Sequence, residues 1–129
     1  MVAVDTNILV RLLTGDDPSQ ASRAEALFRS EEVWVAKTVL LETEWVLRAL
    51  YGFTGEQFTG GLRALAGLPN VHLEDATAVA QAMKWHAQGL DFGDALHLAS
   101  RGAASRFVSF DESLVRRARR AGARGVTLP

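Results

Sequence analysis

Residues 1–11 read MVAVDTNILVR, and the side chains change abruptly from apolar to polar within them. Residues 2–5 are typical of a short strand, and the apolar spacing after them predicts a helix. Three polar side chains, Asp5, Thr6 and Asn7, stand where the strand would meet the helix. Because an unpaired buried charge is costly, Asp5 needs a partner that the rest of the chain must supply.

Predicted strands and helices alternate along the whole chain. Strands are predicted at residues 2–5, 32–36, 71–73, 106–110 and 125–128. Helices are predicted at about 6–14, 17–30, 38–51, 54–68, 75–88, 91–104 and 111–122. This alternation predicts an α/β fold with a central parallel sheet of four to five strands and helices on both faces, formed by residues 1–129 as a single domain. Ligands bind such sheets beyond the carboxyl ends of the strands.

The composition excludes several kinds of site. With 129 residues, 48% hydrophobic and 22% charged, the chain has the make-up of a globular domain. It has no cysteine, which excludes disulfides, thiolate zinc sites and a cysteine nucleophile, and suits a protein of the reducing cytoplasm. The apolar runs are too short to cross a membrane. A net charge of −1 gives no overall signal for nucleic acid.

Acidic residues stand where ligands would bind. Asp5 closes the first strand, Asp111 follows the fourth strand, and Asp94 lies in the first turn of the helix before that strand. Aspartate is also a favoured cap at helix starts, where its charge is stabilising. For Asp111 and for Asp91, capping is at least as good an explanation as chemistry, whereas Asp5 is harder to explain in this way.

Glu42 differs from the other glutamate nearby. On the helix at 38–51 it lies between Val39 and Val46, with no basic residue three or four positions away, whereas Glu44 has Arg48 at i+4. Glu42 is therefore predicted to point inward and Glu44 to face solvent. A buried glutamate without a local counter-charge must be protonated, paired with a distant arginine or bound to a cation.

Acids that converge at one edge of a sheet repel one another unless a cation lies among them. Oxygen ligands, with no cysteine and no well-spaced histidine pair, favour Mg²⁺ or Mn²⁺. Such an ion lowers the pKa of a bound water and stabilises the oxygens of a phosphodiester during cleavage. Asp5 would then be a metal ligand, with Thr6 and Asn7 holding the strand end by hydrogen bonds.

Four blocks of the sequence resemble those of PIN-domain proteins, and more narrowly the VapC-type toxin ribonucleases of toxin–antitoxin pairs. The blocks are DTNILVR at 5–11, VLLETEWVL at 39–47, DFGDALHLA at 91–99 and VSFD at 108–111. The resemblance covers essentially the full length and keeps the order and spacing of the blocks. One block alone is a weak signal, whereas four in order are a strong one.

The resemblance implies a site and an activity. Asp5, Glu42, Asp94 and Asp111 match the four acids of the family's metal site, which are both ligands and catalytic residues. Thr6, Asn7 and Ser109 match its supporting polar residues, and Arg11 matches a frequent basic residue in the first helix. The family's reaction is endonucleolytic cleavage of RNA with Mg²⁺ or Mn²⁺. Its members usually form homodimers and are inhibited by a small antitoxin protein.

Other charged residues stay open to two interpretations. Asp91, a fifth acid, either caps its helix, which we favour, or joins the outer part of the site. In the last helix, Arg116, Arg117 and Arg120 either contact RNA phosphates or form a solvated face near a helix C-terminus. The sequence does not decide between these two roles.

The main functional hypothesis is a metal-dependent endoribonuclease that acts as a toxin. An alternative enzyme is a PIN nuclease that processes RNA or cuts DNA without a toxin role. An alternative of another class is a non-catalytic module whose acidic pocket docks a basic segment, although such a module does not require all four acids. A phosphoacceptor receiver domain needs adjacent acids at the first strand and a suitably placed lysine, which this chain lacks.

Overall fold

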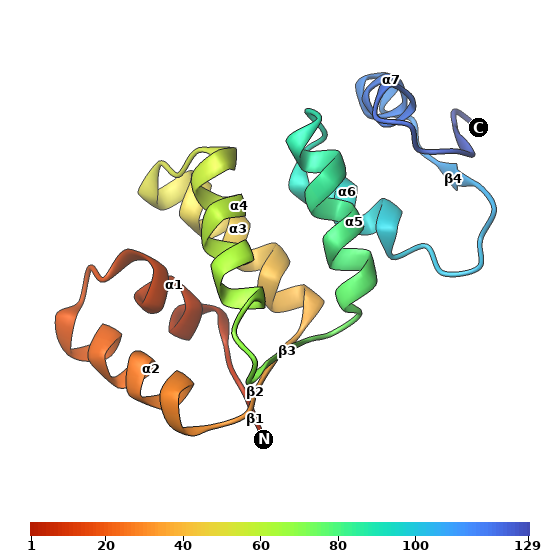
Figure 1. The fold of residues 1–129 in the computed structure, drawn as a ribbon. Helices are drawn as coiled ribbons and strands as arrows, with labels where there is room; N and C mark the ends of the chain where they lie inside the picture. The colour runs from red at the N-terminus through yellow and green to blue at the C-terminus, as the bar shows by residue number, and fades with distance from the viewer. The chain divides into compact units, whose positions relative to one another are not determined.

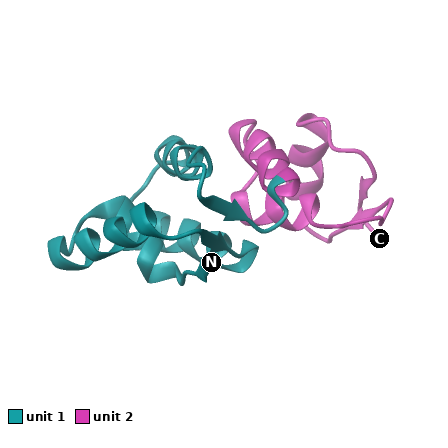
Figure 2. Ribbon diagram, turned by 60° about the horizontal axis from the view of Figure 1, so that its bottom comes forward, with its two compact units in different colours: residues 1–76 teal, residues 77–129 magenta.

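The computed structural model describes all residues from Met1 to Pro129. The chain divides into two compact units, Met1–Ala76 and Thr77–Pro129, which Figure 2 shows in teal and magenta. Each unit contains helices and parallel strands.

The first unit contains a three-stranded parallel sheet and four helices (Figure 1). Its strands are β1 (Val2–Ala3), β2 (Val33–Val35) and β3 (Val71–Leu73), and its helices are α1 (Thr6–Thr14), α2 (Pro18–Ser30), α3 (Lys37–Tyr51) and α4 (Gly55–Ala66). The sheet has the order β1-β2-β3, and Val33 pairs with both Val2 and Val71. Helix α1 packs against α2 and α3. Its Leu9 is completely buried, as are Val33, Val35, Leu40 and Leu47.

The second unit contains three helices and one pair of strands. The helices are α5 (Ala76–Ala87), which begins at the unit boundary, α6 (Phe92–Ala99) and α7 (Glu112–Arg120). The strands β4 (Phe107–Val108) and β5 (Val126–Thr127) are parallel. The most buried side chains of this unit include Val79, Phe92, Leu98 and Val126.

Local signals in the sequence set the ends of the helices. Asp17 accepts a hydrogen bond from the backbone N–H of Gln20 at 3.1 Å and caps α2. Thr54 and Gln57 form the reciprocal capping box that their spacing predicts. Gly52, with a φ of 68°, ends α3 in the left-handed conformation that glycine adopts easily.

The predicted α/β class, with parallel strands and helices in alternation, is confirmed. The strands are shorter than expected. The first ends at Ala3 because Asp5, two residues later, is already the cap of α1.

The predicted orientation of the two glutamates on α3 is wrong. The buried face of α3 consists of Leu40, Thr43, Glu44 and Leu47, and Glu42 is exposed. The Glu44 side chain is only 6% exposed and forms an ion pair with Arg48 at 3.0 Å. Arg48 at i+4 therefore compensates a buried carboxylate and does not mark a solvated face.

Gly125 is the glycine whose replacement the second unit tolerates least. It has a φ of +71°, and a Cβ atom there would lie 2.2 Å from the carbonyl oxygen of Ser105. Gly102 has a similar φ of +62° but open space around it. A substitution at Gly102 therefore tests the cost of the positive φ alone. A substitution at Gly125 adds the steric overlap with Ser105.

We expect Gly102→Ala to lower the free energy of unfolding by about 1 kcal/mol, the usual cost of a left-handed non-glycine residue. Gly125→Ala should cost at least about 2 kcal/mol more, because the backbone must also move to relieve the overlap. Urea denaturation followed by circular dichroism measures both values. Equal losses in the two variants would contradict the close approach of Gly125 to Ser105.

Candidate functional site

The junction of β1 and α1 orients the first predicted metal ligand. Asp5 is the N-cap of α1, and its Oδ1 accepts a hydrogen bond from the backbone N–H of Thr6 at 2.6 Å. Thr6 is buried, and its hydroxyl donates to Oε1 of Glu42 on α3. The backbone N–H of Thr6 thus holds Asp5, and the side-chain hydroxyl of Thr6 holds Glu42. The exposed position of Glu42 agrees with a ligand that faces a solvent-filled site.

Both acids line one pocket of the first unit, with a volume of about 320 Å³. It is lined by Asp5, Thr6, Asn7, Val10, Arg11, Glu42, Val46, Leu50 and Tyr51. Neither acid forms an ion pair with a lysine or an arginine. The pocket therefore presents two uncompensated carboxylates, each with one oxygen already bound and one without a protein partner.

Arg11, at the edge of this pocket, is held in place by several side chains. Its Nη1 donates to Asp16 at 3.0 Å and to the Tyr51 hydroxyl at 3.1 Å, and its Nε donates to Gln20 at 2.7 Å. Hydrogen bonds from Tyr51 and Thr14 lower the pKa of Asp16, and the charge of Arg11 lowers it further. The Tyr51 hydroxyl is also the main cause of the raised pKa of Arg11. Arg11 is thus a fixed guanidinium whose charge Asp16 compensates.

The second unit brings three further acids into one neighbourhood. Asp91 is the N-cap of α6, and its Oδ2 accepts a hydrogen bond from the backbone N–H of Asp94 at 3.1 Å. Asp111 is the N-cap of α7 and accepts from the backbone N–H of Leu114 at 3.0 Å. The Ser109 hydroxyl accepts a hydrogen bond from the backbone N–H of Asp111, also at 3.0 Å. The predicted capping by Asp91 is confirmed.

The acids of the second unit interact electrostatically, and the interaction changes the pKa of Asp94. Burial raises the pKa of Asp94, and the charges of Asp91 and Asp111 raise it further, while His97 partly offsets the shift. No lysine or arginine forms an ion pair with Asp94 or Asp111. Acids that repel one another in this way, without a lysine or arginine partner, are frequent at functional sites.

The four predicted ligands therefore form two pairs. Asp5 and Glu42 share the pocket of the first unit, and Asp94 and Asp111 are coupled within the second. Within neither unit do three or more acidic, histidine or cysteine side chains gather as a ready-made metal cluster. That the two pairs meet at one site stays a prediction. The donors are carboxylate oxygens, which fit Mg²⁺ or Mn²⁺ better than a thiophilic metal.

The three arginines of α7 that are candidates for contact with RNA, Arg116, Arg117 and Arg120, are exposed. Arg117 donates to the carbonyl oxygen of Gly89 at 3.4 Å, whereas Arg116 and Arg120 form no ion pair. Their contact with RNA stays a prediction. Sequence reasoning missed Tyr51 and Gln20, because the hydrogen bond from Arg11 to Tyr51 spans 40 residues of sequence and carries no local signal.

This arrangement defines an α/β protein with carboxylates at the starts of its helices and an oxygen-only donor set. The chain belongs to the PIN domain family, whose family model matches residues 2–121. No individual curated protein matches the chain. PIN domains are generally nucleases that use divalent metal ions, so membership indicates a metal-dependent nuclease with a nucleic acid as substrate. None of its helices is both long enough and apolar enough to span a membrane.

We expect Asp94→Asn to raise the midpoint of thermal unfolding of the metal-free protein near pH 7. The neutral amide removes the repulsion from Asp91 and Asp111 that raises the pKa of Asp94. A raised folded-state pKa favours the folded state below the unfolded value, and this contribution is lost as the pH rises through the folded value. The gain should therefore disappear below the ordinary pKa of 3.8, where the native carboxyl is protonated.

Thermal unfolding at neutral and at acid pH, followed by circular dichroism, measures this difference. Glu112→Gln is the matched control, because it neutralises an exposed acid at the start of α7 that does not shift the pKa of Asp94. The control should give no gain. A lower midpoint for Asp94→Asn near pH 7, or the same gain at every pH, would contradict the coupling.

Proposed function

We propose that this protein is an endoribonuclease that uses Mg²⁺ or Mn²⁺ and is the toxin of a type II, VapBC-like toxin–antitoxin pair acting in the cytoplasm. The nuclease proposal rests on one observation, which is that the four acids form no ion pair with a cationic side chain of the protein. Each of Asp5, Glu42, Asp94 and Asp111 lacks a lysine or arginine partner, and three of them are oriented by a hydrogen bond that they accept from the protein.

The acids would hold the metal through their remaining oxygens. When bound, Mg²⁺ or Mn²⁺ supplies an activated water and neutralises charge on the phosphodiester. Thr6 orients Glu42 by donating to one carboxylate oxygen, which leaves the other oxygen available. Ser109 accepts from the backbone N–H of Asp111 and so supports the turn that presents this acid. Asn7 and Arg11 line the pocket of Asp5, where they would contact the substrate.

The toxin assignment rests on the four sequence blocks that resemble VapC-type ribonucleases. It implies a small antitoxin as inhibitor and a homodimer as the assembled state, and both are part of the proposal. The alternative nuclease acts in RNA processing or on DNA without an antitoxin. An acidic docking module remains the alternative of another class, and it predicts binding without cleavage.

We expect the purified protein to cleave structured RNA with Mg²⁺ or Mn²⁺ and to lose this activity in EDTA. The variants Asp5→Asn, Glu42→Gln, Asp94→Asn and Asp111→Asn should each lose at least about 100-fold in cleavage rate, because a lost ligand removes several kcal/mol of transition-state stabilisation. Gel analysis of end-labelled RNA measures the rates.

Glu56→Gln, at an exposed acid in the first turn of α4, is the control and should keep full activity. Single-stranded DNA of the same sequence distinguishes a ribonuclease from a DNA nuclease. Cleavage that persists in EDTA or in all four variants would refute the metal site. Binding without cleavage under every condition would support the docking module.

We expect Thr6→Val to reduce both Mn²⁺ affinity and the cleavage rate by about 10- to 100-fold, the usual effect of losing a group that orients a metal ligand. The valine keeps the shape of the buried threonine and removes the hydroxyl that donates to Glu42. Thr6→Ser retains the hydroxyl and should stay near the native values. Isothermal titration with Mn²⁺ gives the affinity, and equal values for both variants would show that the bond to Glu42 has no such role.

A further inference from the structure

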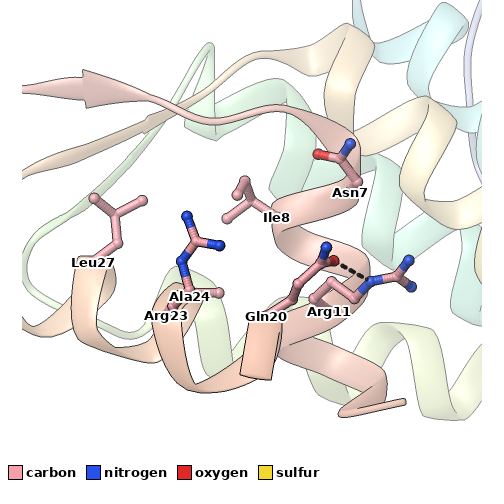
Figure 3. A pocket seen from close by; sticks show the side chains of 7 residues that line it. All are labelled: Asn7, Ile8, Arg11, Gln20, Arg23, Ala24 and Leu27. Carbon is pink, nitrogen blue, oxygen red and sulfur yellow. Dashed lines mark hydrogen bonds between the residues drawn. The ribbon is translucent and has the colours of Figure 1, made fainter. Parts of the chain in front are cut away.

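A second pocket lies beside the acidic one, between α1 and α2. It has a volume of about 410 Å³ and is lined by Asn7, Ile8, Arg11, Gln20, Arg23, Ala24 and Leu27 (Figure 3). We propose that this groove binds one nucleotide that flanks the cleaved bond, with its phosphate on Arg23 and its base against the apolar floor. The inference rests on the proposed function and adds a substrate contact outside the acidic pocket.

The groove combines an apolar floor with a polar rim. Ile8 from α1 and Ala24 and Leu27 from α2 supply the apolar surface. Figure 3 shows Arg23 on α2 between Gln20 and Leu27. A volume of this size is within the usual range for a small-ligand site. An apolar surface next to a cation suits a nucleotide, which has a flat base and a charged phosphate.

Arg23 is an exposed guanidinium whose charge no acid compensates. It forms no ion pair and no hydrogen bond, and the residues three and four positions away on α2 are Ser19, Gln20, Ala26 and Leu27. Its neighbours differ in this respect. Arg29 on the same helix pairs with Glu25 at 3.4 Å, and Arg11 pairs with Asp16 at 3.0 Å.

The groove adjoins the acidic pocket. Asn7 and Arg11 line both pockets, and they lie one turn apart on α1, which is about 6 Å along the helix axis. Nη2 of Arg11 donates to no protein group, while Nε and Nη1 are held by Gln20, Asp16 and Tyr51. A strand whose scissile phosphate lies near Asp5 can therefore pass Arg11 and place its next nucleotide beside Arg23.

The charges favour a nucleic acid strand over a protein segment as the occupant. A basic protein segment would gain from Asp5 and Glu42 but would meet the uncompensated charge of Arg23. A phosphodiester strand gains from Arg23 directly, and it approaches the acids as a ligand of the ion that they hold. RNA contacts of this kind add affinity without base specificity.

The test uses Arg23→Gln and Arg23→Glu, with Arg29→Gln as the control that removes one exposed arginine from the same helix. Fluorescence anisotropy measures the binding of a labelled single-stranded RNA to the full chain without divalent ions, at several salt concentrations. We expect Arg23→Gln to weaken binding about 3- to 10-fold and Arg23→Glu to weaken it more. The slope of log K against log salt should fall by about 0.7, the value for one lost phosphate contact on a single strand. Arg29→Gln should stay within about 2-fold of the native protein, because its arginine already has an acidic partner.

Native-like affinity and salt slope in both Arg23 variants would overturn the subsite and leave the groove to a protein segment. A native chain that does not bind RNA at all would overturn it as well. The proposed function fails separately, if the native chain binds RNA and does not cleave it with Mg²⁺ or Mn²⁺. In that case, weaker binding by the Arg23 variants still supports the nucleotide site.

Discussion

The backbone N–H groups at the start of each helix need acceptors, and aspartate supplies one at α1, α2, α6 and α7. Asp5, Asp91 and Asp111 cap α1, α6 and α7, and each accepts a hydrogen bond through one carboxylate oxygen. The bond fixes the carboxylate and leaves its second oxygen without a backbone donor. The same carboxylate can therefore cap a helix and bind a metal ion. The capping hydrogen bond occupies one oxygen and fixes the direction of the other.

Two glutamates on α3 show how a structural acid differs from a candidate ligand. Glu44 is buried, and Arg48 compensates its charge. Glu42, two residues earlier, is exposed, has no cationic partner and is oriented by a neutral hydroxyl from Thr6. A neutral donor orients a carboxylate without compensating its charge. The charge of Glu42 thus remains available to a ligand, whereas that of Glu44 does not.

The sequence predicts the features that depend on neighbours in the chain. The cap at Asp17, the capping box at Thr54 and the end of α3 at Gly52 are each read from a few adjacent residues, and each is confirmed. Asp5, Asp94 and Asp111 stand out in the sequence because they follow predicted strands or open predicted helices, whereas Glu42 stands out because no basic residue lies three or four positions away. The inward face of α3 was missed, because it depends on which side of the helix packs in the tertiary structure. Val39 and Val46 suggested one side, and the buried stripe through Leu40 and Leu47 lies on another.

Opposite charges in the first unit remain apart although pairing them would be favourable. Asp5 and Glu42 line one pocket and Arg23 lines the next, while Arg11 between them is already compensated by Asp16. The side chains of Asp5, Glu42 and Arg23 are exposed and hydrated, so their separation costs the free protein little and leaves charges of both signs available to a ligand. A substrate that carries a cation at one end and a bare phosphate at the other would satisfy both sets at once. The separation of the acids near the start of α1 from Arg23 on α2 would then orient the bound strand, with its metal-bearing phosphate near Asp5 and its flanking phosphate beside Arg23.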